Sequence, residues 1–279
     1  MTQALRRPGR ARTPVSRAGT GSLATVPAFA LVLFLCLPLV ALLGRAGTSG
    51  GVAPALGQPI VVDALRLSLT ASLAALGLAV ALGSPLALLL ARKRLPAAAL
   101  LDTLVDLPMV LPPSVAGIAL LLAFGRRGLL GGTLSAIGLE LPFTTSAVVL
   151  ASLFVAAPFY VRAARAGFQA VPHEVEEAAM VEGASGWQVF RHVTVPLAAP
   201  SLLGGTVMCW ARALGEFGAT IMFAGSVQGR TQTMPLAIYA ALESDLDAAV
   251  SLALILLALS FALLVLFRRW LSSAASLST

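Results

Sequence analysis

The sequence predicts an all-α membrane protein with six transmembrane helices. Three observations support this fold class: a low charge content, six long apolar runs and an uneven distribution of basic residues. Hydrophobic residues make up 58% of the 279 positions and charged residues only 11%, whereas soluble domains are about 25% charged. The mean hydropathy is +0.92. A chain of this composition is expected to cover its apolar surface with lipid instead of folding into one or two soluble domains.

Six runs have roughly the 20 mostly apolar residues that a helix needs to cross hydrocarbon. These predicted spans lie at residues 26–43, 67–91, 107–125, 141–161, 196–223 and 248–267. The second and the sixth carry no charge, whereas the fifth contains Arg212 and Glu216. Membrane-spanning strands do not fit, because the runs are too long and lack alternating polarity.

The basic residues predict the orientation, because Lys and Arg gather on the cytoplasmic side of a membrane protein. With the N-terminus inside, thirteen of the 19 Lys and Arg residues lie inside, five lie outside and Arg212 lies within a span. We therefore predict a multi-pass protein of the cytoplasmic (inner) membrane with both termini in the cytoplasm. Its membrane domain, at 26–270, is flanked by a C-terminal tail at 271–279 and by a basic, disordered tail at 1–25. The basic tail is expected to contact anionic lipid headgroups, not nucleic acid, and the first span is expected to be uncleaved.

A polar loop at residues 172–196 separates the fourth and fifth spans. Hydrocarbon excludes it, because three carboxylates lie within four positions. Pro172 predicts the start of a short helix, and Gly183 predicts its end. Ser185 and Gln188 have the spacing of a capping box for a second short helix. The small side chains near Gly183 would let another protein approach closely.

The order of residues in this loop resembles the EAA loop of ABC importer permeases. The shared pattern is Glu177-Ala178-Ala179, then Gly183, then Val193-Thr194-Val195-Pro196, in which one residue separates the aliphatic Val193 from the aliphatic-Pro pair. The resemblance implies an ABC importer type I permease fold, in which the loop forms coupling helices that enter a groove on a cytoplasmic ATP-binding subunit. Val193 is one departure, since the general pattern favours Ile there. The residues assigned to ATPase coupling are Glu174, Glu176, Glu177, Ala178, Ala179, Gly183, Trp187 and Pro196.

Three further segments resemble the molybdate permease subfamily. They are Asp106–Ser114 with Phe124–Gly128, Ala213–Thr220 and Gly229–Leu236. The likeness covers roughly residues 60–267, although Gly-Glu-Phe-Gly is shared with sulfate permeases. It implies a homodimer with a central oxyanion pathway, a periplasmic or extracellular molybdate-binding protein, and ATP and Mg bound by the partner subunit. Sulfate or tungstate as cargo, and an ion-coupled secondary anion transporter, are the alternatives.

The chain itself is predicted to be non-catalytic and to bind no cofactor. Its only lysine, Lys93, is not in a phosphate-binding Gly-Lys-Ser/Thr motif. The sequence also shows no metal-ligand spacing and no Ser/His/Asp arrangement. If ATP drives the protein, a separate subunit must hydrolyse it.

Ionisable residues in a span usually face the bundle interior or a water-filled cavity. Arg212 and Glu216 are four positions apart, on one face of a helix. They line either the translocation path or the subunit interface, or they form a structural ion pair. Gly215 and Gly218 either break the helix or allow tight helix packing. Pro112 and Pro113, with Pro108, mark either a hinge or a kinked entry to the third span. Three arginines are predicted on the outer side, Arg126, Arg127 and Arg230. They either contact the oxyanion or the binding protein, or they are simply solvated.

Overall fold

The computed structural model describes residues 20–48, 55–93 and 97–276, and within these ranges it consists of helices and turns without a strand. The predicted all-α membrane fold is confirmed. Five helical segments are long and apolar enough to cross a membrane, and a bent pair of helices would make a sixth crossing. The long helices are α1 (Thr20–Thr48), α3 (Pro59–Ala91), α7 (Thr145–Ala170), α10 (Val195–Leu214) and α13 (Leu246–Ser276). The shorter ones are α4 (Ala98–Val110), α5 (Pro113–Phe124), α6 (Gly131–Ala136), α8 (His173–Val181), α9 (Gly186–Val189), η1 (Phe190–Thr194), α11 (Gly218–Phe223) and α12 (Met234–Leu242).

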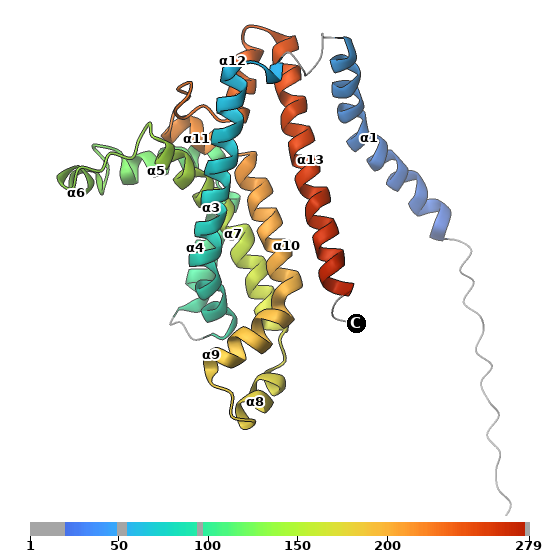
Figure 1. Cartoon of the computed structure of the whole chain (residues 1–279), viewed down its shortest axis with the longest axis vertical. Helices are drawn as coiled ribbons and strands as arrows, with labels where there is room; N and C mark the ends of the chain where they lie inside the picture. Colours follow the sequence, from blue (N-terminus) through green and yellow to red (C-terminus); the bar gives the residue numbers. More distant parts are fainter. Residues whose placement is uncertain (1–19, 49–54, 94–96, 277–279) are drawn as a thin grey trace, which may run out of the picture.

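Helix α7 is the centre of the bundle and packs along both α3 and α10 (Figure 1). Small residues allow this close packing. A Cβ added at Gly167 would lie 2.7 Å from Ser201 Cβ, and one added at Gly205 would lie 2.7 Å from Ala163 Cβ. Membrane helices often pack through such small residues, since lipid supplies little hydrophobic drive for association.

Helix α1 stands apart from this bundle and lies beside α13 (Figure 1). No part of its most apolar stretch is buried within the described chain. At the end of the bundle where α12 lies, Arg45 Nη2 is 2.9 Å from Asp247 Oδ1 of α13, and this exposed ion pair connects the two helices. An all-round apolar surface of this kind requires lipid or another protein around it.

The predicted span at 107–125 is broken by a sharp turn, as a hinge at Pro112 and Pro113 would produce. Helices α4 and α5 meet there at 117°, so the segment turns sharply after Val110. Two consecutive prolines explain the turn: each removes a backbone N–H, and Pro112 pushes Leu111 into extended geometry with ψ 135°. Helix α4 also begins well before the predicted span, at Ala98. Its first turns contain Asp102 and Asp106, so this part of the helix is not an apolar run and hydropathy does not detect it.

The fifth predicted span, 196–223, is also discontinuous. Helix α10 ends at Leu214, and α11 begins only at Gly218. Of the two interpretations of Gly215 and Gly218, a helix break is therefore the one found. The remaining spans are longer than predicted, because hydropathy detects only the part of a helix that matches hydrocarbon.

The tail boundaries shift for the same reason. Helix α1 begins at Thr20, inside the predicted N-terminal tail, and α13 continues to Ser276, inside the predicted C-terminal tail. Residues 1–19 and 277–279 lie outside the described residues, and so does the rest of the two tail predictions.

Replacing Gly205 by Leu is expected to destabilise the fold, because the new side chain must push α7 and α10 apart. Overpacking of this kind costs about 1–3 kcal/mol. The neighbouring Gly204 is a matched control, since a Cβ there meets nothing within 4 Å. The measurement is the thermal unfolding midpoint of each purified variant in detergent. Equal midpoints for Gly205→Leu and Gly204→Leu would contradict the packing argument.

Candidate functional site

The loop between α7 and α10 forms two short helices at the end of the bundle opposite α12 (Figure 1). Pro172 precedes α8, and Glu174 and Glu176 occupy its first turn, where carboxylates favour the helix dipole. Helix α8 ends at Val181, and Gly183 has a φ of +93°, a conformation that favours glycine. The predicted helix start and glycine stop are confirmed.

The second short helix, α9, begins with the predicted capping box. Gln188 N donates to Ser185 Oγ at 3.4 Å, and Ser185 N donates to Gln188 Oε1 at 2.7 Å. The following turn, η1, is a π-helix that leads directly into α10. Phe190 of η1 stacks near Phe168 of α7, with ring centroids 6.3 Å apart. The aromatic contact holds α9 against the bundle.

Most of the residues assigned to ATPase coupling lie on the outside of this loop. Trp187 is 66% exposed although it is a large aromatic residue. The apolar Val181 is 86% exposed and lies at the end of α8. The exposed members of the assigned set are Glu174, Glu177, Ala178, Gly183, Trp187 and Pro196, and Ala179 is half-buried. Acidic and apolar side chains are thus available together for a partner surface.

Glu176 differs from its neighbours, because its side chain points into the bundle. Its Oε1 atom lies 2.5 Å from Arg92 Nη2 and accepts a hydrogen bond from Thr194 Oγ1 at 2.6 Å. The Glu176 side chain is only 12% exposed. A partner protein cannot reach this carboxylate directly, because Arg92 and Thr194 enclose it, so Glu176 differs in its surroundings from the exposed Glu174 and Glu177.

The intramembrane pair Arg212 and Glu216 is formed, but across a helix break. Arg212 Nη1 lies 2.6 Å from Glu216 Oε2, and Ala219 N donates to Glu216 Oε1 at 2.8 Å. The Glu216 side chain is 1% exposed and that of Arg212 is 29% exposed. The carboxylate therefore joins the end of α10 to the start of α11, as a structural ion pair would.

The two helix breaks lie against each other. A Cβ added at Gly218, after the second break, would lie 2.5 Å from Pro113 Cβ, directly after the first. Pro112, Pro113 and Gly215 are exposed in the isolated chain. The structure thus places the break at Gly215–Gly218 against the break at Pro112 and Pro113, whereas Glu216 is buried and pairs with Arg212.

Two of the three outer arginines share a cavity of about 700 Å³ that Thr144 also lines. Arg126 Nη2 lies 2.6 Å from Glu140 Oε2, which lines the same cavity, so the positive charge of Arg126 is already matched. Arg230 lines the same cavity, whereas Arg127 is exposed but is not among the lining residues. The structure therefore groups Arg126 with Arg230 and separates Arg127 from them.

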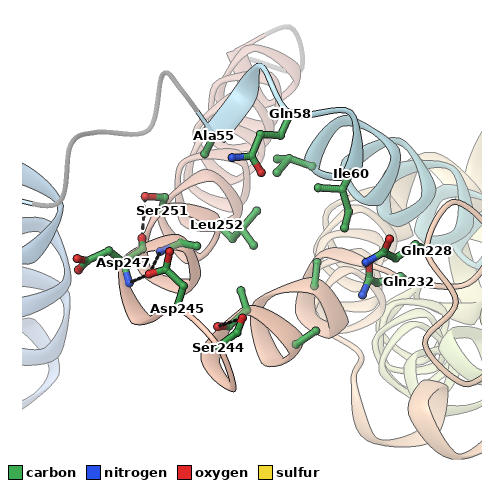
Figure 2. A pocket seen from close by; sticks show the side chains of 15 residues that line it. Ala55, Gln58, Ile60, Gln228, Gln232, Ser244, Asp245, Asp247, Ser251 and Leu252 are labelled. Atoms are coloured by element: carbon green, nitrogen blue, oxygen red, sulfur yellow. Dashed lines mark hydrogen bonds between the residues drawn. The ribbon is translucent and has the colours of Figure 1, made fainter.

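Sequence reasoning missed a second cavity, of about 510 Å³, at the end of the bundle where α3, α12 and α13 meet. Figure 2 shows Gln58 on one side of it and Gln228 with Gln232 on another. Asp245 Oδ1 accepts from Asp247 N at 2.9 Å and so caps α13, and the Asp247 carboxylate pairs with Arg45. Isolated glutamines in connecting segments follow no motif, and for this reason no sequence signal pointed to the cavity.

Neither a metal site nor a thiol pair is found in the described part of the chain. No group of three His, Cys, Asp or Glu residues there could hold a metal ion. Cys36 and Cys209 are both free.

Comparison with known proteins identifies the class of protein. The profile of the family "Binding-protein-dependent transport system inner membrane component" matches residues 83–276. The chain belongs to this family. It is therefore a multi-pass inner-membrane component of a transport system, and the resemblance found in the loop is confirmed.

Individual relatives support the same family. The "Molybdenum transport system permease protein ModB" of Mycobacterium tuberculosis is 44% identical over 241 residues, covering 86% of this chain and 90% of the relative. The protein of that name from Escherichia coli K12 is 38% identical over 212 residues, covering 75% and 93%. The "Sulfate transport system permease protein CysW" of Synechococcus elongatus is 39% identical over 181 residues, covering 65% and 63%.

Solved structures with the same fold are more distant in sequence. A chain of a bacterial ABC transporter involved in the import of the acidic polysaccharide alginate has a TM-score of 0.70 at 17% identity, covering 90% of this chain and 94% of that one. A chain of the inward-facing MetNI methionine ABC transporter has a TM-score of 0.61 at 16% identity, covering 77% and 96%. The fold is that of an ABC importer permease.

Replacing Arg212 by Ala is expected to lower the free energy of unfolding, because the buried Glu216 carboxylate loses its counter-charge. Removal of one partner of a buried pair costs about 3–5 kcal/mol, and the partial exposure of Arg212 favours the lower value. The exposed Arg127→Ala variant is the control. Denaturant unfolding of both purified variants measures the difference, and equal stabilities would show that the pair contributes nothing.

Proposed function

We propose that this chain is the transmembrane permease subunit of an ATP-driven molybdate importer. The observation that carries the proposal is the 44% identity to the M. tuberculosis molybdenum permease, which extends over 90% of that protein. The sulfate permease relative covers only 65% of this chain, and this shorter match favours molybdate. The chain would form the oxyanion pathway and would perform no covalent chemistry.

ATP and Mg would be bound by a separate cytoplasmic subunit, which docks on the α8–α9 loop. The acidic Glu177 and the apolar Val181 and Trp187 supply the exposed surface for this contact. Glu176 does not contribute to this contact surface, because its side chain is buried. The excess of basic residues at the loop end of the bundle supports a cytoplasmic position for the loop and for both termini.

A homodimer with a central pathway is supported by the surface where the two helix breaks meet. Non-helical backbone at membrane depth is stable only when it is buried in protein or lines a water-filled cavity. Pro112 and Gly215 are exposed in the single chain, so lipid is not a suitable neighbour for them. A second copy of the chain would bury part of this non-helical backbone in protein, and a hydrated path between the two copies would surround the rest with water.

Transport would proceed by alternating access. Closure of the ATP-binding subunits would move the two loops, and the helices would tilt between outward-open and inward-open arrangements. A periplasmic or extracellular molybdate-binding protein would deliver the dianion to the outer face. Arg230 lines an outer cavity beside the Arg126–Glu140 pair and supplies positive charge for the anion or for an acidic surface of the binding protein.

Sulfate and tungstate are alternative cargoes, because they have the same charge and tetrahedral shape as molybdate. The binding protein would make this choice, since it presents the anion to the pathway. An ion-coupled secondary transporter is disfavoured by Glu216, the only carboxylate within the predicted spans. It is held by Arg212 and by Ala219 N, and a coupling carboxylate must instead exchange its partner during transport.

The function is tested by reconstituting the chain in proteoliposomes with an ATP-binding subunit from a neighbouring gene and with the binding protein. Molybdate is expected to stimulate ATP hydrolysis and to accumulate inside the vesicles, whereas sulfate is expected to do so weakly. The measurements are phosphate release and vesicle-trapped metal. Molybdate uptake without ATP, or sulfate stimulation that exceeds molybdate stimulation, would refute the proposal in this form.

Glu177→Lys is expected to reduce molybdate-stimulated ATP hydrolysis by about tenfold, within the usual range for a coupling free energy between two sites. The exposed carboxylate contacts the partner, so the reversal acts on docking and not on folding. Glu243→Lys, an equally exposed change at the opposite end of the bundle, is the control. Unchanged hydrolysis and uptake for Glu177→Lys would remove this residue from the docking surface.

A further inference from the structure

The residues Arg92, Glu176 and Thr194, which we call the inner polar cluster, join three elements at the loop end of the bundle. We propose that this cluster is a positioning device that holds the coupling helix α8 at a fixed angle to α3 and α10. Movement of α8 is then passed to both membrane helices. The inference rests on the proposed function, because it concerns how the docking loop transmits motion.

The geometry of the cluster centres on one carboxylate oxygen. Arg92, which directly follows α3, has Nη2 2.5 Å from Glu176 Oε1, and Thr194 Oγ1 donates to the same oxygen at 2.6 Å. The donors come from the end of α3 and from η1, while the acceptor belongs to α8. His173 Nδ1 lies 3.7 Å from the second oxygen, Glu176 Oε2. Three segments that are far apart in sequence thus meet at one side chain.

Burial makes these contacts strong. The side chains of Arg92 and Glu176 are 10% and 12% exposed, and the Thr194 residue is 2% exposed. Apolar side chains, including Leu88, Leu89 and Phe190, line a small cavity of about 170 Å³ beside the cluster. Water competes poorly for hydrogen bonds in such surroundings, so loss of one donor leaves the carboxylate undersatisfied.

Helix α8 has little else to hold it. Glu176 is the only buried residue among the nine residues of α8. Its apolar side chains point outward: Val175 is 44% exposed, Met180 51% and Val181 86%. Because the apolar face is available for a partner, the attachment of α8 to the bundle depends on the polar contacts of Glu176.

The connection to α10 is continuous. The π-helical η1 carries Thr194 as its last residue, and Val195 N donates to Phe190 O across the wide turn. No flexible linker separates Thr194 from α10, which then runs without interruption to Leu214. The hydrogen bond from Thr194 to Glu176 therefore connects α8 directly with a membrane helix. Wide turns of this type are frequent at functional sites.

The test uses Thr194→Val, which removes the hydroxyl while preserving the side-chain volume, and Thr194→Ser, which keeps the hydroxyl. The complex is reconstituted as above, and molybdate transported per ATP hydrolysed is measured together with the amount of assembled complex. Thr194→Val and Glu176→Gln are expected to lower the ratio about tenfold, as the loss of one hydrogen bond to a charged group would do. Thr194→Ser should restore the ratio, and Glu243→Gln, the same kind of change at an exposed position at the opposite end of the bundle, should leave it unchanged.

The proposal would be overturned if Thr194→Val transported as much molybdate per ATP hydrolysed as the wild type. It would also be overturned if Thr194→Val reduced the amount of assembled complex but kept this ratio, because the contact would then be merely structural. Failure of the wild-type complex to respond to molybdate would instead refute the proposed function.

A second readout, the mobility of α8 in the permease alone, separates these cases. In a Cys36→Ser, Cys209→Ala background, a spin label at the exposed position of Ala178 reports the mobility of α8 in the permease alone. The label should become more mobile in Thr194→Val and not in Thr194→Ser, and equal mobility in both would also overturn the inference.

Discussion

Ionisable side chains that lie among the apolar helices of this chain are matched by partners from the chain itself, and this pairing constrains the rest of the structure. An unpaired charge in a low-dielectric environment costs several kcal/mol, far more than an exposed one. Arg165 of α7 pairs with Asp102 of α4, Arg212 pairs with Glu216, and Arg92 pairs with Glu176. Each pair joins two elements, so the requirement for a counter-charge also determines which helix ends lie together.

The same constraint applies to the backbone at the two helix breaks. Glu216 accepts a hydrogen bond from Ala219 N and so occupies the start of α11, while its other oxygen lies beside Arg212. Gly218 packs closely on Pro113, which places one break against the other. A break in a membrane helix is stabilised when a neighbouring segment covers it. Because the two breaks contact each other, each is partly covered by the other. The parts that stay exposed, at Pro112, Pro113 and Gly215, mark the surface that another protein or water must cover.

Much of the fold and of the loop could be predicted from the sequence, because the controlling interactions are local. The capping box of Ser185 with Gln188 and the glycine stop at Gly183 depend on residues within a few positions. The difference between Glu176 and Glu177 could not be predicted, since the buried one is selected by Arg92, which lies 84 positions earlier. Prolines indicated a bend near Pro112, but the 117° angle depends on how α5 packs against α11.

The position of the breaks relative to the loop has a mechanical consequence. Helix α10 is continuous over 20 residues, or about 30 Å, between η1 and Gly215. Beyond Pro200, α10 has no further proline and resists bending, so a displacement of this part reaches Leu214 with little loss. The first place that can absorb a rotation is the non-helical segment after Leu214, directly beside Pro113 and the end of α4. Any movement imposed on the loop is therefore delivered to the surface where the two breaks meet, far from the point at which it was applied.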